Sequence, residues 1–318
     1  MQFQLRHDVE NLTAPGTRRV GSRGHELARN YLVQRMEKTG LSPYSGKSYE
    51  LPYTVDDQKF INLAGVLPGK NPDLDPLLLV AHYDTCGDQP GADDNAAAIA
   101  IWFSLIDLLK ANALERSLIF LFPDAEEPPY FLSVQMGSTN FYQHQRKTHL
   151  HAGLVLDLVG HDVPMKGMED LIFLFGAESH PELAKVLREV IPPKGLRNIA
   201  TLNRYIGDLS DHHILRENDE PYLFFTCGRW QHYHQGSDKP EHLNYEKMER
   251  IAHYLYELIQ CIAATDLSDY AGPYDPVDME ITLIKRALGE YLDAHKLRME
   301  NRSDIQKLVL NWVSDHKL

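Results

Sequence analysis

Cysteine is scarce in this chain of 318 residues, which contains only Cys86, Cys227 and Cys261. Three cysteines are too few for a disulfide framework, and an odd number would leave one of them unpaired. The composition therefore argues against a small disulfide-stabilised secreted domain. A reducing compartment fits better, and the cytoplasm is the location that we expect.

Long runs of one residue type are missing too. No stretch is rich in Lys and Arg, and 45 acidic against 32 basic residues give a net charge of −13. This balance argues against nucleic acid or an anionic membrane as the main partner. No apolar run approaches the roughly 20 residues that cross a bilayer, and the N-terminal stretch MQFQLRHDVENL lacks the apolar core of a signal peptide.

Short apolar runs alternate with helical patterns along most of the chain. Runs that predict buried strands lie at 77–80, 118–122, 153–160, 170–178 and 221–228, and a further strand is expected within 49–69. Helical patterns lie at 24–40, 96–109, 139–146, 181–191 and 245–264. This alternation is typical of the α/β class, so we predict a mainly parallel, twisted sheet with helices on both faces.

Polar side chains gather where the predicted strands end. His82 and Asp84 follow one strand, Glu126 and Glu127 follow the next, and Asp157 lies at the end of a third. The loops add further candidates, which are Asp93, Asp94, His232, His234 and Asp238. Carboxylates mixed with imidazoles suit zinc or a similar divalent ion. The set is too large for one tetrahedral site, and two ions that share a carboxylate would account for it.

The order of the motifs is more specific than any one of them. AHYDT, GADDN, DAEE, LDLVG, SDHH and HQGSD follow one another as they do in the M28 family of zinc aminopeptidases, which this chain resembles from about Gly21 to the helix after Asn244. The resemblance implies the fold of the zinc-dependent exopeptidases (phosphorylase/hydrolase-like). It also implies two Zn²⁺ ions, or a single one, with cobalt or manganese as substitutes. The implied substrate is a peptide with a free N-terminus.

The resemblance also implies roles for individual residues. The metal ligands would be His82 and Asp157 for one ion, Glu127 and His234 for the other, and Asp94 between the two. Glu126 would be the general base that takes a proton from the attacking water, and Asp84 would orient the His82 ring. In this family the peptide bond between Asp93 and Asp94 is typically cis.

Substrate contacts are harder to assign. The SDHH motif suggests Asp211 and His212, and aromatic residues of the loops suggest Tyr130 and Trp230. The loop EEPPYFLSVQMGS is longer than is usual after the paired glutamates, so the side-chain preference of the family does not transfer. For Cys86, an idle thiol is a better interpretation than a metal ligand.

Helical patterns at 281–292 and 305–313 follow the region of resemblance. We predict a catalytic domain over residues 1–268 and a helical extension over 269–318, which packs on that domain or builds a homo-oligomeric interface. Three alternatives stay open. The closest is a glutaminyl cyclase with one zinc ion, which shares fold and motif order. A non-catalytic binding module of the same fold is another. An M20 peptidase would need a lid domain before the last histidine.

Overall fold

The central strands of the sheet come from the apolar runs of the sequence. In the computed structural model, which describes residues 1–268 and 274–316, these strands are β4 (Leu77–Val80), β5 (Leu118–Phe122), β6 (Ala152–Leu156) and β9 (Tyr222–Thr226). Every residue in them is buried, as expected for strands covered on both faces. They pair in parallel in the order β5-β4-β6-β9, with Leu79 opposite both Phe120 and Leu154.

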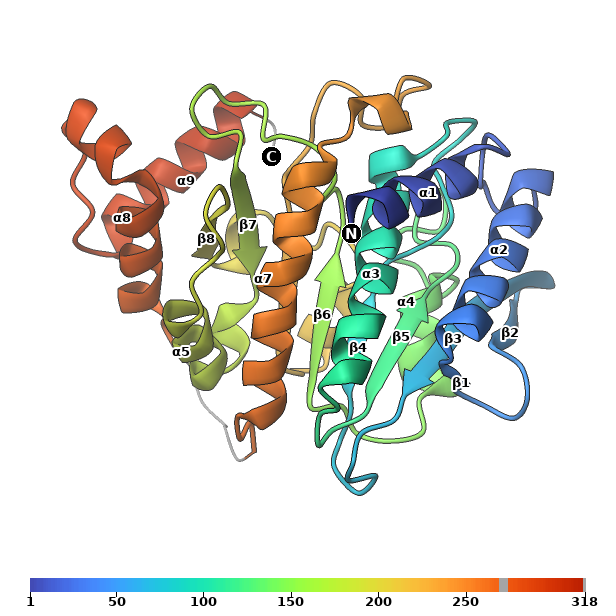
Figure 1. Ribbon diagram of the computed structural model, residues 1–318. Helices are drawn as coiled ribbons and strands as arrows, with labels where there is room; N and C mark the ends of the chain where they lie inside the picture. Colours follow the sequence, from blue (N-terminus) through green and yellow to red (C-terminus); the bar gives the residue numbers. More distant parts are fainter. Residues whose placement is uncertain (269–273, 317–318) are drawn as a thin grey trace.

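The flanks of the sheet add antiparallel pairs. On one side β3 (Gln58–Leu67) pairs with β5, and it also pairs with β1 (Ser42–Pro43) and β2 (Glu50–Val55). On the other side β7 (Leu171–Phe175) runs antiparallel to β9 and parallel to β8 (Arg197–Thr201). The β7 arrow therefore points against those of β5 and β6 in Figure 1. The α/β fold is confirmed, as a mixed sheet whose centre is parallel.

Helices cover both faces of this sheet (Figure 1). The longer ones on the near face are α1 (Gln2–Thr13), α2 (Arg23–Thr39), α3 (Ala97–Ala111), α5 (Pro181–Glu189) and α7 (Tyr245–Ala264). The remaining α-helices are α4 (Gly137–Asn140), α6 (His213–Glu217), α8 (Val277–Ala294) and α9 (Arg302–His316). Single helical turns lie at Ala92–Ala96, Phe141–Gln145, Ala177–Ser179, Asn203–Tyr205 and Pro240–His242.

The helix boundaries follow local chemistry. At the start of α2 the Ser22 hydroxyl accepts a hydrogen bond from the backbone N–H of His25 at 3.1 Å, and Gly40 ends the helix with φ of 70°. The predicted strands and long helices are all present, within a few residues of their expected ends. Helix α1 and strand β8 are additions that the sequence did not predict, and the one strand expected within 49–69 is two, β2 and β3.

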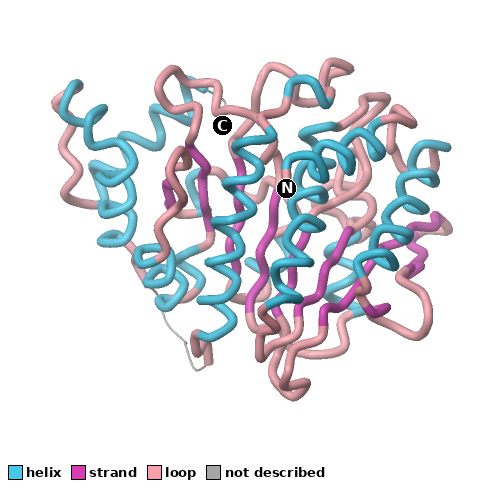
Figure 2. Tube along the Cα trace, in the orientation of Figure 1, coloured by secondary structure: helices cyan, strands magenta, loops and turns pink. Residues whose placement is uncertain are grey.

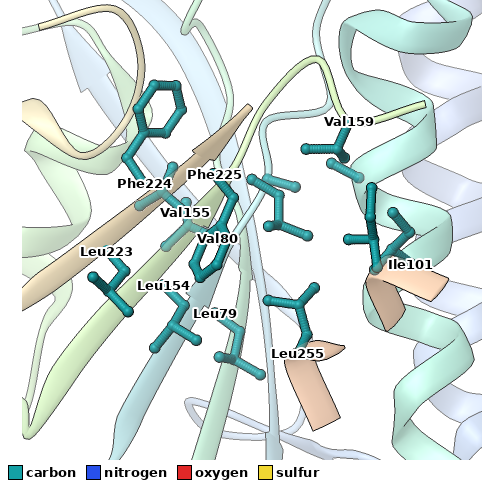
Figure 3. Packing of buried hydrophobic residues seen from close by; sticks show 14 of the residues in the cluster. Leu79, Val80, Ile101, Leu154, Val155, Val159, Leu223, Phe224, Phe225 and Leu255 are labelled. Atoms are coloured by element: carbon teal, nitrogen blue, oxygen red, sulfur yellow. The ribbon is translucent and has the colours of Figure 1, made fainter. Parts of the chain in front are cut away.

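The core lies between the central strands and α3 and α7. Figure 3 shows Leu79, Leu154 and Leu223 on neighbouring strands, with Ile101 of α3 and Leu255 of α7 packed near them. Between Asp157 and His234 the chain forms β7, α5, β8, α6 and β9, so this stretch belongs to the sheet and its cover and forms no separate lid. Among the described residues, no helix has the length and apolarity that crossing a bilayer requires.

The C-terminal helices join the β8 side of the sheet, where α8 packs on β8 and α9 packs on α8. Part of the predicted extension, residues 269–273 and 317–318, lies outside the described residues. The division into a catalytic domain and an extension stays a prediction.

Candidate metal centre

The candidate site lies along one edge of the sheet, where the parallel strands end. His82 and Asp84 follow β4, Glu126 and Glu127 follow β5, and Asp157 follows β6. In Figure 2 the loops after these strands run along the upper edge of the sheet. Ligands of open α/β sheets bind at this kind of edge, because the carboxyl ends of parallel strands converge there.

Asp94 lies between two histidines. One of its carboxylate oxygens is 3.3 Å from Nε2 of His82, and the other is 3.3 Å from Nε2 of His234. Nε2 of His82 is also 3.7 Å from Asp157, and Nε2 of His234 is 3.1 Å from Glu127. The five predicted ligands thus come together as two groups that share Asp94.

Several polar atoms of this cluster are buried without a hydrogen-bond partner among the described residues. They are Nδ1 and Nε2 of His82, Oδ2 of Asp94, Oε1 of Glu127, Oδ1 of Asp157 and Nε2 of His234. An unpaired polar atom in the interior costs free energy unless something binds it. Imidazole nitrogens and carboxylate oxygens are the donor atoms that zinc prefers, and three-residue sets within the cluster have ligand atoms within 4.8 Å of one another. The donor set therefore fits divalent metal ions.

The pKa values of the buried groups in this cluster also indicate a site for positive ions. Burial raises the pKa of Glu127 to about 8 and that of Glu126 well above its usual range. Although burial disfavours its charge, Asp94 has a lowered pKa because His234 and His82 face it. Burial likewise opposes the charge of His234, but Asp94 and Glu127 raise its pKa to about 10. Buried carboxylates gathered in this way are stabilised by positive charge placed beside them, which fits a site for cations.

Two further carboxylates hold the backbone of the cluster. Asp84 accepts hydrogen bonds from the backbone N–H groups of Glu126 at 3.0 Å and Glu127 at 3.1 Å, and its Oδ1 lies 3.5 Å from Nδ1 of His82. Asp238 does the same for Asp93 at 2.9 Å and Asp94 at 3.1 Å. Asp84 therefore positions the backbone of both glutamates. It also faces the His82 ring, which is the ring that the family resemblance expects it to orient.

Asp93 does not face the cluster. Its carboxylate binds the backbone N–H of Gly160 and Nδ1 of His161, both at 2.7 Å. The His161 ring in turn stacks on Trp230, with 4.4 Å between ring centroids. The cis peptide bond lies one residue later than the resemblance implies, between Asp94 and Asn95.

Arg18 is a component that sequence reasoning missed. It is fully buried, and its guanidinium donates to the carbonyl oxygens of Tyr83 at 2.8 Å, Pro90 at 2.5 Å and Gly91 at 2.9 Å. A fourth, longer bond of 3.3 Å reaches the carbonyl of Asp94. Arg18 thus ties the loop that carries Asp94 to the end of β4. No local pattern around position 18 signals this role.

A cavity of about 390 Å³ opens from the cluster. Asp94, Glu126, Glu127, Asp157 and His234 line one part of it. Most of the remaining lining is apolar, and it includes Phe131, Phe173, Phe175, Ile199, Phe224, Tyr233, Ile284, Leu308 and Trp312. A large apolar cavity beside a few converging polar groups is the usual form of a small-molecule site.

The four predicted substrate contacts occupy different places. Asp211 is buried, its carboxylate lacks a hydrogen-bond partner among the described residues, and burial raises its pKa to about 7. His212 is buried against Phe224, with ring centroids 4.2 Å apart. Tyr130 lines a second, separate pocket of about 380 Å³, and Trp230 is not among the residues that line either pocket. These roles stay predictions.

Two residues that competed for metal roles can also be placed. Nδ1 of His232 lies 2.8 Å from the Ser237 hydroxyl, its ring stacks on His242, and it belongs to none of the ligand sets found among the described residues. Cys86 is half-buried, and its sulfur lies within 4.8 Å of ligand atoms of Glu127 and His234.

Comparison with known proteins agrees with this geometry. Residues 62–259 match the model of peptidase family M28. A Caenorhabditis elegans protein assigned as endoplasmic reticulum metallopeptidase 1-A is 34% identical over an alignment of 190 positions that covers 53% of this chain and 20% of that protein. The chain spans between 15% and 64% of the length of the curated relatives it matches.

Solved structures with the same fold include peptidases and cyclases. A Zn-dependent exopeptidase from Parabacteroides distasonis superposes with a TM-score of 0.66 at 17% identity, over 82% of this chain and 98% of the other. A glutaminyl cyclase from Fimbriiglobus ruber gives 0.66 at 20% identity, over 82% and 95%. Because the family model covers more than half of the sequence, including every residue of the cluster, this chain belongs to peptidase family M28.

Proposed function

We propose that the protein is a zinc-dependent aminopeptidase that binds two ions and removes the first residue of peptides with a free N-terminus. The observation that carries this proposal is the placement of Asp94, whose two oxygens face two different histidines at 3.3 Å each. His82 and Asp157 would hold one ion, and Glu127 and His234 the other. When bound, the ions would polarise the carbonyl of the scissile bond and make water a stronger nucleophile.

The residues of the chain would supply proton transfer and orientation. Glu126 lies beside the ligands, with its Oε2 3.7 Å from Nε2 of His82. Burial raises its pKa, so its carboxylate can accept a proton from the attacking water and deliver it to the leaving amine. Asp84 binds the backbone N–H groups of Glu126 and Glu127, which fixes the position of the proposed base relative to the neighbouring metal ligand.

The chemistry of the cavity favours a peptidase over a cyclase. A glutaminyl cyclase must bind the polar amide of a glutamine side chain, and an apolar lining offers such an amide few partners. The presence of all five predicted ligands argues against a binding module without activity. The cyclase remains the second candidate because glutaminyl cyclases are among the structural neighbours. For the compartment we propose the cytoplasm, supported by three cysteines that are all free.

The experiment compares two reactions of the zinc-loaded protein. We expect release of p-nitroaniline from aminoacyl p-nitroanilides and no release of ammonia from peptides that begin with glutamine. The opposite result would establish the cyclase. Absence of both reactions, in protein shown by plasma spectrometry to hold zinc, would contradict both enzyme assignments.

A further inference from the structure

The far wall of the cavity comes from a part of the chain outside the family match. Ile284 of α8 and Leu308, Val309 and Trp312 of α9 line the cavity, whereas the matched segment ends at residue 259. All four side chains are at least nine-tenths buried. This wall therefore lies outside the segment that matches the family.

The two helices are attached firmly to the sheet and to each other. Glu280 of α8 is fully buried, accepts a hydrogen bond from the Thr201 hydroxyl of β8 at 2.8 Å, and forms an ion pair with Arg302 at the start of α9. Trp312 near the end of α9 approaches the Phe173 ring of β7, with 6.3 Å between centroids. The wall thus has a fixed position relative to the cluster.

The wall leaves the cavity both large and apolar. An apolar cavity of about 150 Å³ is enough to bind benzene, and this one measures about 390 Å³. Two threonines in the lining have hydrogen-bond partners, since the Thr201 hydroxyl donates to Glu280 and the Thr226 hydroxyl accepts from the backbone N–H of Gly228. The part of the cavity away from the carboxylates therefore suits an apolar group larger than an aliphatic side chain.

The two parts of the cavity match the two ends of an aminoacyl group. The end lined by Glu126, Glu127 and Asp157 holds the reacting centre and so suits the amino end of the substrate, while an aromatic side chain gains most by burial among apolar residues. We propose that α8 and α9 form the wall of the cavity that selects the substrate's first side chain, a proposal that rests on the aminopeptidase function. They select peptides whose first residue has a large aromatic side chain, such as phenylalanine or tryptophan.

The test uses a matched pair of variants on one helix. Leu308→Trp places a large ring in the cavity, whereas Leu310→Trp places the same ring on the outer face of α9, where Leu310 is 45% exposed. We expect the zinc-loaded parent to prefer phenylalanine p-nitroanilide over alanine p-nitroanilide. Leu308→Trp should lower kcat/KM for the phenylalanine substrate by roughly tenfold or more, and by a much smaller factor for the alanine substrate, whose methyl group needs little of the cavity. Leu310→Trp should change neither.

Calorimetry separates this proposal from the proposed function. L-Tryptophanol and L-alaninol, which cannot be hydrolysed, are titrated into the zinc-loaded parent and both variants. Tight binding of L-tryptophanol that only Leu308→Trp weakens would support the wall even if no anilide were cleaved. Should Leu308→Trp unfold, Ile284→Trp fills the same space from α8. The proposal would be overturned if Leu308→Trp lowered kcat/KM equally for both substrates. It would also be overturned if that variant bound L-tryptophanol as tightly as the parent.

Discussion

Replacing Arg18 by alanine should lower the free energy of unfolding by about 4 kcal/mol. The guanidinium makes three hydrogen bonds of 2.5 to 2.9 Å to backbone carbonyls from a fully buried position. Burial lowers the pKa of Arg18 to about 10, opposed by nearby carboxylates, so the group is charged at pH 7. Charge-assisted bonds contribute about 1.5 kcal/mol each at the low end of their range, and three of them give about 4 to 5 kcal/mol.

That loss is large against the roughly 5 to 15 kcal/mol by which domains are stable. Urea denaturation at pH 7, followed by circular dichroism, measures it directly. Arg19→Ala is the matched control, because the Arg19 side chain is exposed and its ion pair is a long one of 3.9 Å to the exposed Asp88. This neighbouring variant should stay within about 0.5 kcal/mol of the parent.

The reasoning also predicts a local effect. Without Arg18, the loop that ends at Asp94 loses its attachment to β4, so zinc affinity should fall even in molecules that remain folded. If Arg18→Ala does not fold, Arg18→Lys should give an intermediate loss, since one ammonium group can reach fewer carbonyls. A change below about 1 kcal/mol in Arg18→Ala would refute the argument, because three buried carbonyls cannot lose a charged donor at so small a cost.

Three other predictions concern the site and its surroundings. Glu126→Gln should retain both zinc ions, measured by plasma spectrometry, while turnover falls by roughly 10² to 10⁴, because the base is lost and the ligands remain; unchanged turnover would remove Glu126 from the mechanism. Asp94→Ala should lose both ions, since its carboxylate faces both histidines, and retention of one full equivalent would argue against sharing. Burial lowers the pKa of His212 to about 3, so its contribution to stability is complete above pH 6.5 and is lost as the pH falls toward 3. Urea denaturation should therefore show that His212→Phe loses about 2 kcal/mol less than the parent between pH 7 and pH 5, and equal losses would contradict this sign.

Sequence patterns anticipated the parts of the molecule that depend on local chemistry. Runs such as Leu118–Phe122 are apolar throughout because both faces of a central strand are covered, and a polar residue directly after such a run must lie at the edge of the sheet. This reasoning predicted that His82, Glu127 and Asp157 lie close together at that edge. The loops offered several candidates, and the family resemblance selected His234 over His232, because no local rule positions a loop.

What the sequence did not reveal depends on contacts between distant segments. Arg18 binds carbonyls more than sixty positions away, and backbone carbonyls leave no trace in a sequence. The aromatic residue Trp230 could equally have lined a pocket or stacked on another ring, and it stacks on His161. Helical periodicity located α9 but not its neighbour across the cavity, since an apolar helix face does not specify its partner.

The hydrogen bonds of Asp238 have a consequence for the order in which the protein can be made. Asp93 and Asp94 leave the ribosome long before Asp238, whose carboxylate accepts hydrogen bonds from their backbone N–H groups. His234, which lies 3.1 Å from Glu127, also follows them by about 140 positions. A growing chain can therefore form the β4–β5–β6 edge first, and the complete cluster can assemble only after residues 234–238 have been synthesised.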